Sequence, residues 1–139
     1  MKPMRELIFG GPRFSSLAGD IGLLVLRVFA GLSLALAHGL GKLPPSPQFV
    51  AGVERLGFPG WAGWLSAFAE VVGGFALAAG LGTRLAALLI ATNLSVAAFL
   101  QHANDPYGRK ELPFLFLAVA IMFVFVGGGR FSLDRVVKR

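Results

Sequence analysis

The sequence predicts an all-α integral membrane protein, a bundle of four transmembrane helices. Hydrophobic residues make up 55% of the 139 residues and charged residues only 14%. The mean hydropathy of +0.72 is far above that of a typical soluble domain. Crossing a bilayer takes about 17 to 25 apolar residues. Four stretches have this length: residues 20–39, 61–80, 83–101 and 112–128.

The segments around these stretches divide the chain into three parts. Residues 1–19 are expected to form a cytoplasmic N-terminal lead, residues 20–128 the transmembrane domain and residues 129–139 a basic cytoplasmic tail. Glycine, proline and serine are frequent in the lead, and its apolar residues follow no clear period. We therefore expect the lead to be loosely held.

A short helix is predicted between the first two spans. Gly39 and the prolines that follow it are expected to end the first span, because proline lacks a backbone donor and restricts its predecessor. Phe49, Val53 and Leu56 then recur at helical spacing, with polar residues between them. This pattern indicates an amphipathic helix over residues 48–56 at the outer membrane interface.

Two further local signals define the ends of the later spans. Residues 80–82, Gly-Leu-Gly, predict a tight turn on the inner side, with Thr83 as the N-cap of the third span. Glu111 and Pro113 are expected to open the fourth span, since both residue types favour a helix start.

Basic residues predict that both termini are cytoplasmic. With this orientation, eight lie inside: Lys2, Arg5, Arg13, Arg84, Arg130, Arg135, Lys138 and Arg139. Four lie outside: Lys42, Arg55, Arg109 and Lys110. The excess follows the positive-inside rule. The net charge of +6 does not indicate nucleic-acid binding, because the basic residues follow the topology and form no aromatic or glycine-rich surface.

The alternative is a secreted protein with a signal peptide. Basic residues precede the first apolar run, which contains a small-x-small triplet at residues 35–37. An arginine inside that run, Arg27, is foreign to signal peptides, and three more apolar stretches follow. The membrane protein is therefore the favoured interpretation.

Polar residues inside the spans are predicted to meet near the bilayer midplane. Counted from the outer ends at about 1.5 Å per residue, Arg27, Glu70 and Asn93 all fall about 12 to 18 Å deep in a core about 30 Å thick. An isolated charge there is costly. We expect a structural ion pair between Arg27 and Glu70, with Asn93 as an added hydrogen-bonding group.

A second polar layer is expected at the outer ends of the spans. Its members are His38, Lys42, Gln101, His102 and Glu111. Arg27 and His38, eleven residues apart, fall within about 20° of one face of an ideal helix. Such a layer could line a pocket for a quinone ring, another polar head or an anion, with the Arg27–Glu70 pair as its floor.

The candidate ligand-binding residues are therefore Arg27, His38, Glu70, Asn93, Gln101 and His102. The alternative is that the Arg27–Glu70 pair only fixes helix register. Ligation of a haem by the two histidines is disfavoured, no metal site is expected, and no catalytic residue is assigned. The chain has no cysteine, which excludes disulfides, thiolate catalysis and cysteine-ligated iron–sulfur clusters within it.

Several short motifs occur together in order. They are Leu26-Arg27, Gly31, His38-Gly39, Gly41-Lys42, Phe49, Gly57-Phe58-Pro59, Ala69-Glu70, Gly73-Gly74, residues 80–84 (GLGTR) and residues 127–134 (GGGRFSLD). In this order and spacing they resemble the DoxX family of small membrane proteins, from about Ile21 to Asp134. The closing motif has glycine at its middle, where the family commonly has proline.

The resemblance implies a four-helix protein of the prokaryotic inner (plasma) membrane that is an oxidoreductase or a membrane subunit of one. A quinone or similar small molecule is then the expected ligand, with a redox partner protein or a second copy of the chain as expected partners besides the lipid bilayer. Two alternatives stay open: a non-catalytic membrane anchor or assembly partner, and a small-solute transporter. The lack of cysteine argues against a self-contained sulfur relay.

Overall fold

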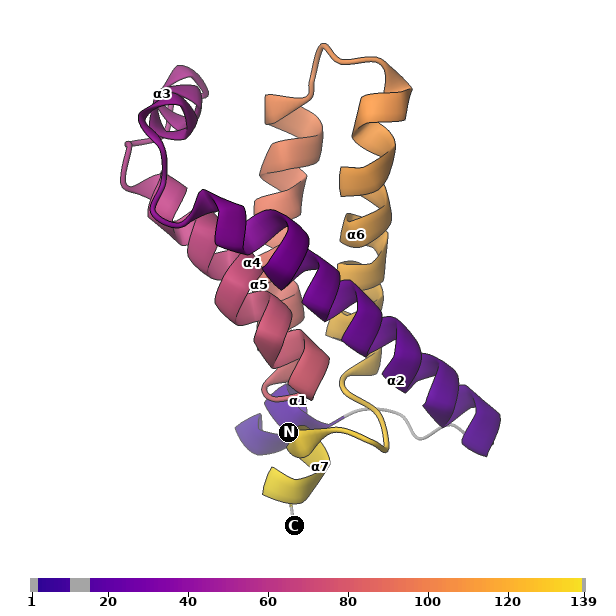
Figure 1. The fold of residues 1–139 in the computed structure, drawn as a ribbon. Helices are drawn as coiled ribbons and strands as arrows, with labels where there is room; N and C mark the ends of the chain where they lie inside the picture. Colours follow the sequence, from indigo (N-terminus) through magenta and orange to yellow (C-terminus); the bar gives the residue numbers. More distant parts are fainter. Residues whose placement is uncertain (1–2, 11–15, 139) are drawn as a thin grey trace.

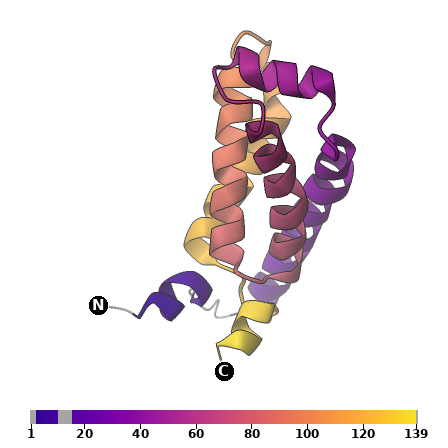
Figure 2. The same ribbon diagram turned by 90° about the vertical axis from the view of Figure 1, so that its left-hand side faces the viewer.

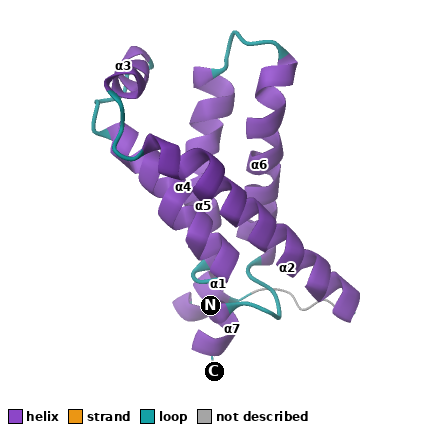
Figure 3. Cartoon of the chain, viewed as in Figure 1, coloured by secondary structure: helices purple, strands orange, loops and turns teal. Residues whose placement is uncertain are grey.

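The computed structural model describes residues 3–10 and 16–138, and all regular secondary structure in these residues is helical (Figures 1 and 3). The helices are α1 (Met4–Phe9), α2 (Leu17–Leu32), α3 (Pro47–Arg55), α4 (Ala62–Ala79), α5 (Thr83–Val96), α6 (Tyr107–Val126) and α7 (Leu133–Val137). Two π-helical segments, η1 (Ser33–Gly39) and η3 (Ala97–Gln101), and the 3₁₀ turn η2 (Leu40–Lys42) extend α2 and α5. The all-α prediction is confirmed.

Three continuous helical segments of the described chain are long and apolar enough to cross a membrane: Leu17–Lys42, Ala62–Ala79 and Thr83–Gln101. The third has the predicted bounds. Helix α6 packs along α5, and its uncharged part begins only at Leu112. Both chain ends lie at the same end of the bundle, beside α1 and α7, while α3 lies at the opposite end (Figures 1 and 2).

Helices α2 and α4 cross with their backbones almost in contact. A Cβ atom added to Gly31 would lie 2.5 Å from the carbonyl oxygen of Gly74, and one added to Gly74 would lie 2.7 Å from that of Gly31. Around this crossing the core consists of aliphatic side chains and alanines, with Phe123 of α6 fully buried. Small residues therefore set the closest approach of the two helices.

The predicted helix between the first two spans is present as α3. Ser46 accepts a hydrogen bond from the backbone N–H of Phe49 at 3.2 Å and so caps the helix, with Pro47 at its first position. Gly57 follows the helix with a φ of +88°, a conformation that favours glycine.

The predicted turn at Gly80-Leu81-Gly82 is also present, but Thr83 is not the N-cap of α5. Gly82 holds that position, and the cap comes from a distant residue, Asp134. Its carboxylate accepts from Gly82 N at 2.6 Å and from Thr83 N at 2.9 Å. Asp134 N also donates to Gly80 O at 2.8 Å, so the C-terminal segment is fastened to the α4–α5 turn.

The prediction of a loosely held lead is wrong for its described part, because residues 4–9 form helix α1. Arg84 of α5 donates to Leu7 O and to Phe125 O, each at 2.9 Å, and so joins α1 to the end of α6. Glu6 pairs with Lys138 at 3.4 Å. The glycine, proline and serine residues at 11–15 lie outside the described residues.

Helix α6 starts five residues earlier than predicted. Pro106 occupies the N-cap, and the helix begins at Tyr107. Pro113 therefore lies inside the helix and does not open it. The three charged residues 109–111 become part of the first two turns, which is why the apolar pattern alone placed the start at 112.

The Gly31–Gly74 crossing predicts opposite effects for two glycine substitutions in α2. Gly31→Ala should lower the free energy of unfolding by about 1 to 3 kcal/mol, because its Cβ overlaps α4. Gly22 has no atom within 4 Å of an added Cβ, so Gly22→Ala should leave stability equal or higher through better helix propensity. Reversible unfolding in bicelles measures both, and equal effects would contradict this account of the crossing.

The Asp134 cap predicts a large effect from a residue near the C-terminus. Asp134→Ala should lower the free energy of unfolding by about 3 kcal/mol, since it removes two charge-assisted hydrogen bonds from buried N–H groups. The matched control is Asp105→Ala in the α5–α6 loop. A melting temperature of Asp134→Ala as high as that of the control would disprove the role of the cap.

Candidate functional site

A cavity of about 300 Å³ lies between α3, α4 and α5 at the end of the bundle that carries α3. Phe49, Leu65 and Leu89 are among the apolar side chains that form most of its wall. Its polar lining residues are Lys42, Ser66, Glu70, Thr92, Asn93 and Gln101. An apolar cavity with a few convergent polar groups is the usual form of a small-molecule site.

Glu70 is the central polar group of this cavity. Its side chain is only 4% exposed, and its Oε1 accepts from Lys42 Nζ at 2.7 Å and from Asn93 Nδ2 at 3.0 Å. The second oxygen, Oε2, is buried and has no hydrogen-bond partner among the described residues. Buried polar atoms are rarely left unpaired in proteins, so Glu70 carries an acceptor whose partner is not among the described residues.

Lys42 reaches Glu70 because the first span continues past Gly39 as η2. A Cβ atom added to Gly39 would lie 2.9 Å from Val71 N and 3.0 Å from the carbonyl carbon of Glu70. Gly39 is therefore a contact point between the first span and α4, and the prediction that the helix ends there is wrong. The π-helical turns adjoin the site, as such turns often do.

Helix α3 covers the cavity through its apolar face. Phe49 packs against Gly63 of α4, where an added Cβ would lie 3.4 Å from the Phe49 ring, and Val53 lies 3.8 Å from the same position. The Lys42 ammonium lies 5.4 Å from the centroid of the Phe49 ring, within the range of a cation–π interaction. The amphipathic pattern predicted the helix, and its apolar face is the part that encloses the site.

The predicted ion pair between Arg27 and Glu70 does not form. Arg27 is 1% exposed. Its Nη1 donates to Leu77 O at 3.0 Å and Ala78 O at 2.8 Å, and its Nη2 donates to Phe131 O at 2.7 Å. These are carbonyls of the last turn of α4 and of the C-terminal loop, and Asp134 adds electrostatic attraction.

The depth estimate failed because the first span ends at Lys42 and not at Gly39. From that end Arg27 lies about 22 Å down the helix, whereas Glu70 lies about 12 Å below Ala62, at 1.5 Å per residue. Arg27 therefore reaches the C-terminal end of α4. The sequence signal for Lys42 as the partner of Glu70 was available, because glycines alone need not end a helix and the first proline is Pro44.

The two histidines contact other groups. The His38 ring lies edge-on to Phe116 of α6, with 5.9 Å between centroids, and it does not line the cavity. His102 Nδ1 is 2.7 Å from Asp105 Oδ2, and this hydrogen bond holds the pKa of Asp105 below its usual value. Of the predicted set, the structure brings together Glu70, Asn93 and Gln101, and separates Arg27, His38 and His102 from them.

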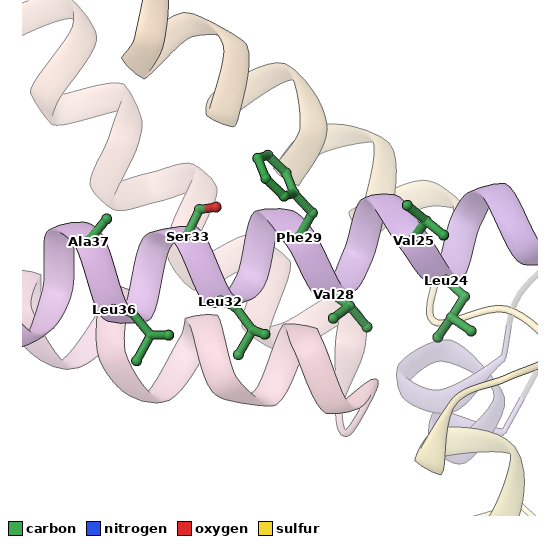
Figure 4. Close-up of a pocket in the computed structure, with 8 residues that line it drawn as sticks. All are labelled: Leu24, Val25, Val28, Phe29, Leu32, Ser33, Leu36 and Ala37. Carbon is green, nitrogen blue, oxygen red and sulfur yellow. The ribbon is translucent and has the colours of Figure 1, made fainter.

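A second hollow runs along the outer face of α2 and η1 (Figure 4). Its lining residues are Leu24, Val25, Val28, Phe29, Leu32, Ser33, Leu36 and Ala37. One hydroxyl, that of Ser33, is the only polar side-chain group in this lining. The surface suits contact with lipid chains.

The observed contacts predict that Arg27 and Glu70 act independently. The free-energy changes of Arg27→Met and Glu70→Gln should add in the double variant within about 0.5 kcal/mol, because the two side chains share no partner. Lys42→Met and Glu70→Gln should instead couple by about 1 kcal/mol or more. Double-mutant cycles on unfolding in bicelles measure both. Strong coupling between residues 27 and 70 would show that the two side chains do form an ion pair, and would contradict the observed contacts.

Comparison with known proteins agrees with this membrane fold. A sequence model of the DoxX family matches residues 22–103, more than half of the chain. The chain is 32% identical over 128 residues to "Inner membrane protein YqjF" of Escherichia coli (strain K12), covering 86% of this chain and 95% of that protein. It is 29% identical over 119 residues to "Putative oxidoreductase CatD" of Bacillus subtilis (strain 168), covering 85% and 88%. No solved structure matches. The chain therefore belongs to the DoxX family.

Proposed function

We propose that this DoxX-family protein is an inner-membrane subunit of an oxidoreductase and binds a quinone or a similar small molecule in the Glu70 cavity. The names of the two relatives, "Inner membrane protein YqjF" and "Putative oxidoreductase CatD", support the membrane location and the redox role. The observation that carries the proposal is the buried Glu70 carboxylate, with one oxygen paired and the other free, at the wall of an apolar cavity.

The chemistry of the cavity suits a ring with polar substituents. Aromatic and aliphatic side chains such as Phe49 and Leu65 would contact the ring faces, and the cavity volume lies at the lower end of the range for small-molecule sites. Glu70 would exchange hydrogen bonds or a proton with the ligand, and Lys42 would hold the charge of Glu70. Lys42 is thus the ion-pair partner of Glu70, the role expected of Arg27 from the sequence.

The electrons would come from a partner protein. The chain has no cysteine, so it cannot hold a thiolate-ligated iron–sulfur cluster or exchange a disulfide. A membrane subunit that binds the quinone while a partner supplies the electron donor is consistent with both the cavity and the missing thiols.

The proposed topology has four spans, with both termini in the cytoplasm. It is supported by the packing of α6 along α5 and by the common position of α1, α7 and both chain ends (Figure 1). Arg5, Arg84 and Arg135 lie in the elements at that end, as the positive-inside rule requires. Helix α3 and the mouth of the cavity would then lie at the outer surface.

Filling the cavity should remove a retained quinone. Ser66 lines the Glu70 cavity and Ser33 lines the hollow on α2, and both are half-buried. In protein extracted with native lipid, Ser66→Phe should lower the quinone content at least fivefold by occupying the cavity, while Ser33→Phe should leave it unchanged. Mass spectrometry of the extract measures this. A wild-type protein free of quinone, or equal contents in the two variants, would refute the proposal.

The contacts of Arg27 favour one alternative function, that of a non-catalytic membrane anchor. This charge bonds backbone carbonyls of two segments, so it serves the fold and not a ligand. If the Lys42–Glu70 ion pair is likewise structural, the protein binds no ligand there and serves only as a membrane anchor. Absence of quinone from the wild-type extract would favour this alternative.

A further inference from the structure

The donors around Glu70 are distributed unequally between its two oxygens. Lys42 Nζ and Asn93 Nδ2 both donate to Oε1, and Oε2 receives no hydrogen bond from the described residues. Three other buried side-chain atoms also have no partner: Arg27 Nε, Thr83 Oγ1 and Arg84 Nε. Of the four residues concerned, Glu70 alone lines the cavity between α3, α4 and α5.

The chemistry of Oε2 restricts the ligand group that can meet it. A carboxylate that forms an ion pair with a lysine only accepts hydrogen bonds. A hydroxyl can donate to it, whereas a carbonyl oxygen can only oppose it with another lone pair. The neighbouring hydroxyl of Thr92 does not change this, because it donates to Leu88 O at 2.9 Å. The buried lining atom that lacks a partner among the described residues is thus an acceptor, whereas the donors Lys42 Nζ and Asn93 Nδ2 are already bonded to Oε1.

We propose that the cavity selects a ligand with a hydroxyl donor, a phenol or a quinol, over the analogue with a carbonyl or ether oxygen. This inference rests on the proposed function and adds which redox form of the ligand the site prefers. A buried hydrogen bond to a charged acceptor is strong enough for a preference of about tenfold or more. For a bound quinone couple, a tenfold preference for the quinol raises the two-electron midpoint potential by about 30 mV.

The same geometry predicts that one substitution abolishes the selectivity. In Glu70→Gln the amide oxygen would take the place of Oε1, because Lys42 and Asn93 both offer donors there. The amide nitrogen would then replace Oε2 and present a donor to the ligand. A hydroxyl oxygen and an ether or carbonyl oxygen can both accept from this donor, so the variant should no longer prefer the hydroxyl ligand.

The test uses two probes, 4-hexylphenol and 4-hexylanisole, in the second of which a methyl group replaces the donor hydrogen, with full-length protein in nanodiscs of phosphatidylcholine and phosphatidylglycerol. Empty nanodiscs correct for partitioning into lipid, and calorimetry gives the two affinities. We expect the wild type to bind the phenol about tenfold more tightly than the anisole, and Glu70→Gln to bind the two probes with nearly equal affinity. Glu54→Gln, an exposed carboxylate on α3, is the matched control and should keep the wild-type ratio.

The outcomes separate this inference from the proposed function. Equal affinities of the wild type for the two probes, with both lost in Ser66→Phe, would overturn the donor selectivity while the cavity remains a binding site. No binding of either probe, together with quinone-free native protein, would refute both. The wild-type ratio decides the inference even if Glu70→Gln fails to fold.

Discussion

The structure depends on one constraint: a charge inside the bilayer must find partners within the protein, since hydrocarbon offers none. The two charges deepest in the spans, Arg27 and Glu70, meet this constraint in different ways. Arg27 uses carbonyls at the end of α4 and in the C-terminal loop. Glu70 uses side chains from two other helical segments. Each charge therefore holds together the segments at its own end of the bundle.

The Arg27 end explains why segments far apart in the sequence form one unit. The guanidinium joins α2 to α4 and to the loop before α7, and Gly80 leaves it room because a Cβ there would collide with Arg27 Nη1. Asp134, in α7 directly after this loop, then caps α5. A buried cation beside carbonyls at a helix C-terminus, and an anion at the next helix N-terminus, both agree with the helix dipoles. The C-terminal segment is thus part of the fold and not a free tail.

The sequence predicted what depends on local pattern: the long apolar helices, the amphipathic helix α3 and the turn at residues 80–82. Depth matching also placed Asn93 as a hydrogen-bonding group near Glu70, and the two side chains are hydrogen-bonded. The sequence did not predict contacts that depend on exact helix length or on distant segments. The first span continues past Gly39 to Lys42, which the apolar pattern alone did not show, and this extra length brings Lys42, and not Arg27, to Glu70. The Asp134 cap spans about fifty residues, and Thr83 looked like a sufficient local cap.

The Glu70 end differs from the Arg27 end in what it encloses. At Arg27 the backbone carbonyls come from α4 and a loop that pack directly on the guanidinium, and Gly80 lies so close that not even a Cβ would fit beside it. At Glu70, helix α3 does not fill the space beside α4 and α5, and the three helices enclose a cavity. A protein that needed Glu70 only for helix register could have closed this gap with larger side chains in place of Ser66 and Ala69, which line it. Small residues beside a buried carboxylate keep the space open, and this combination is what a binding site requires.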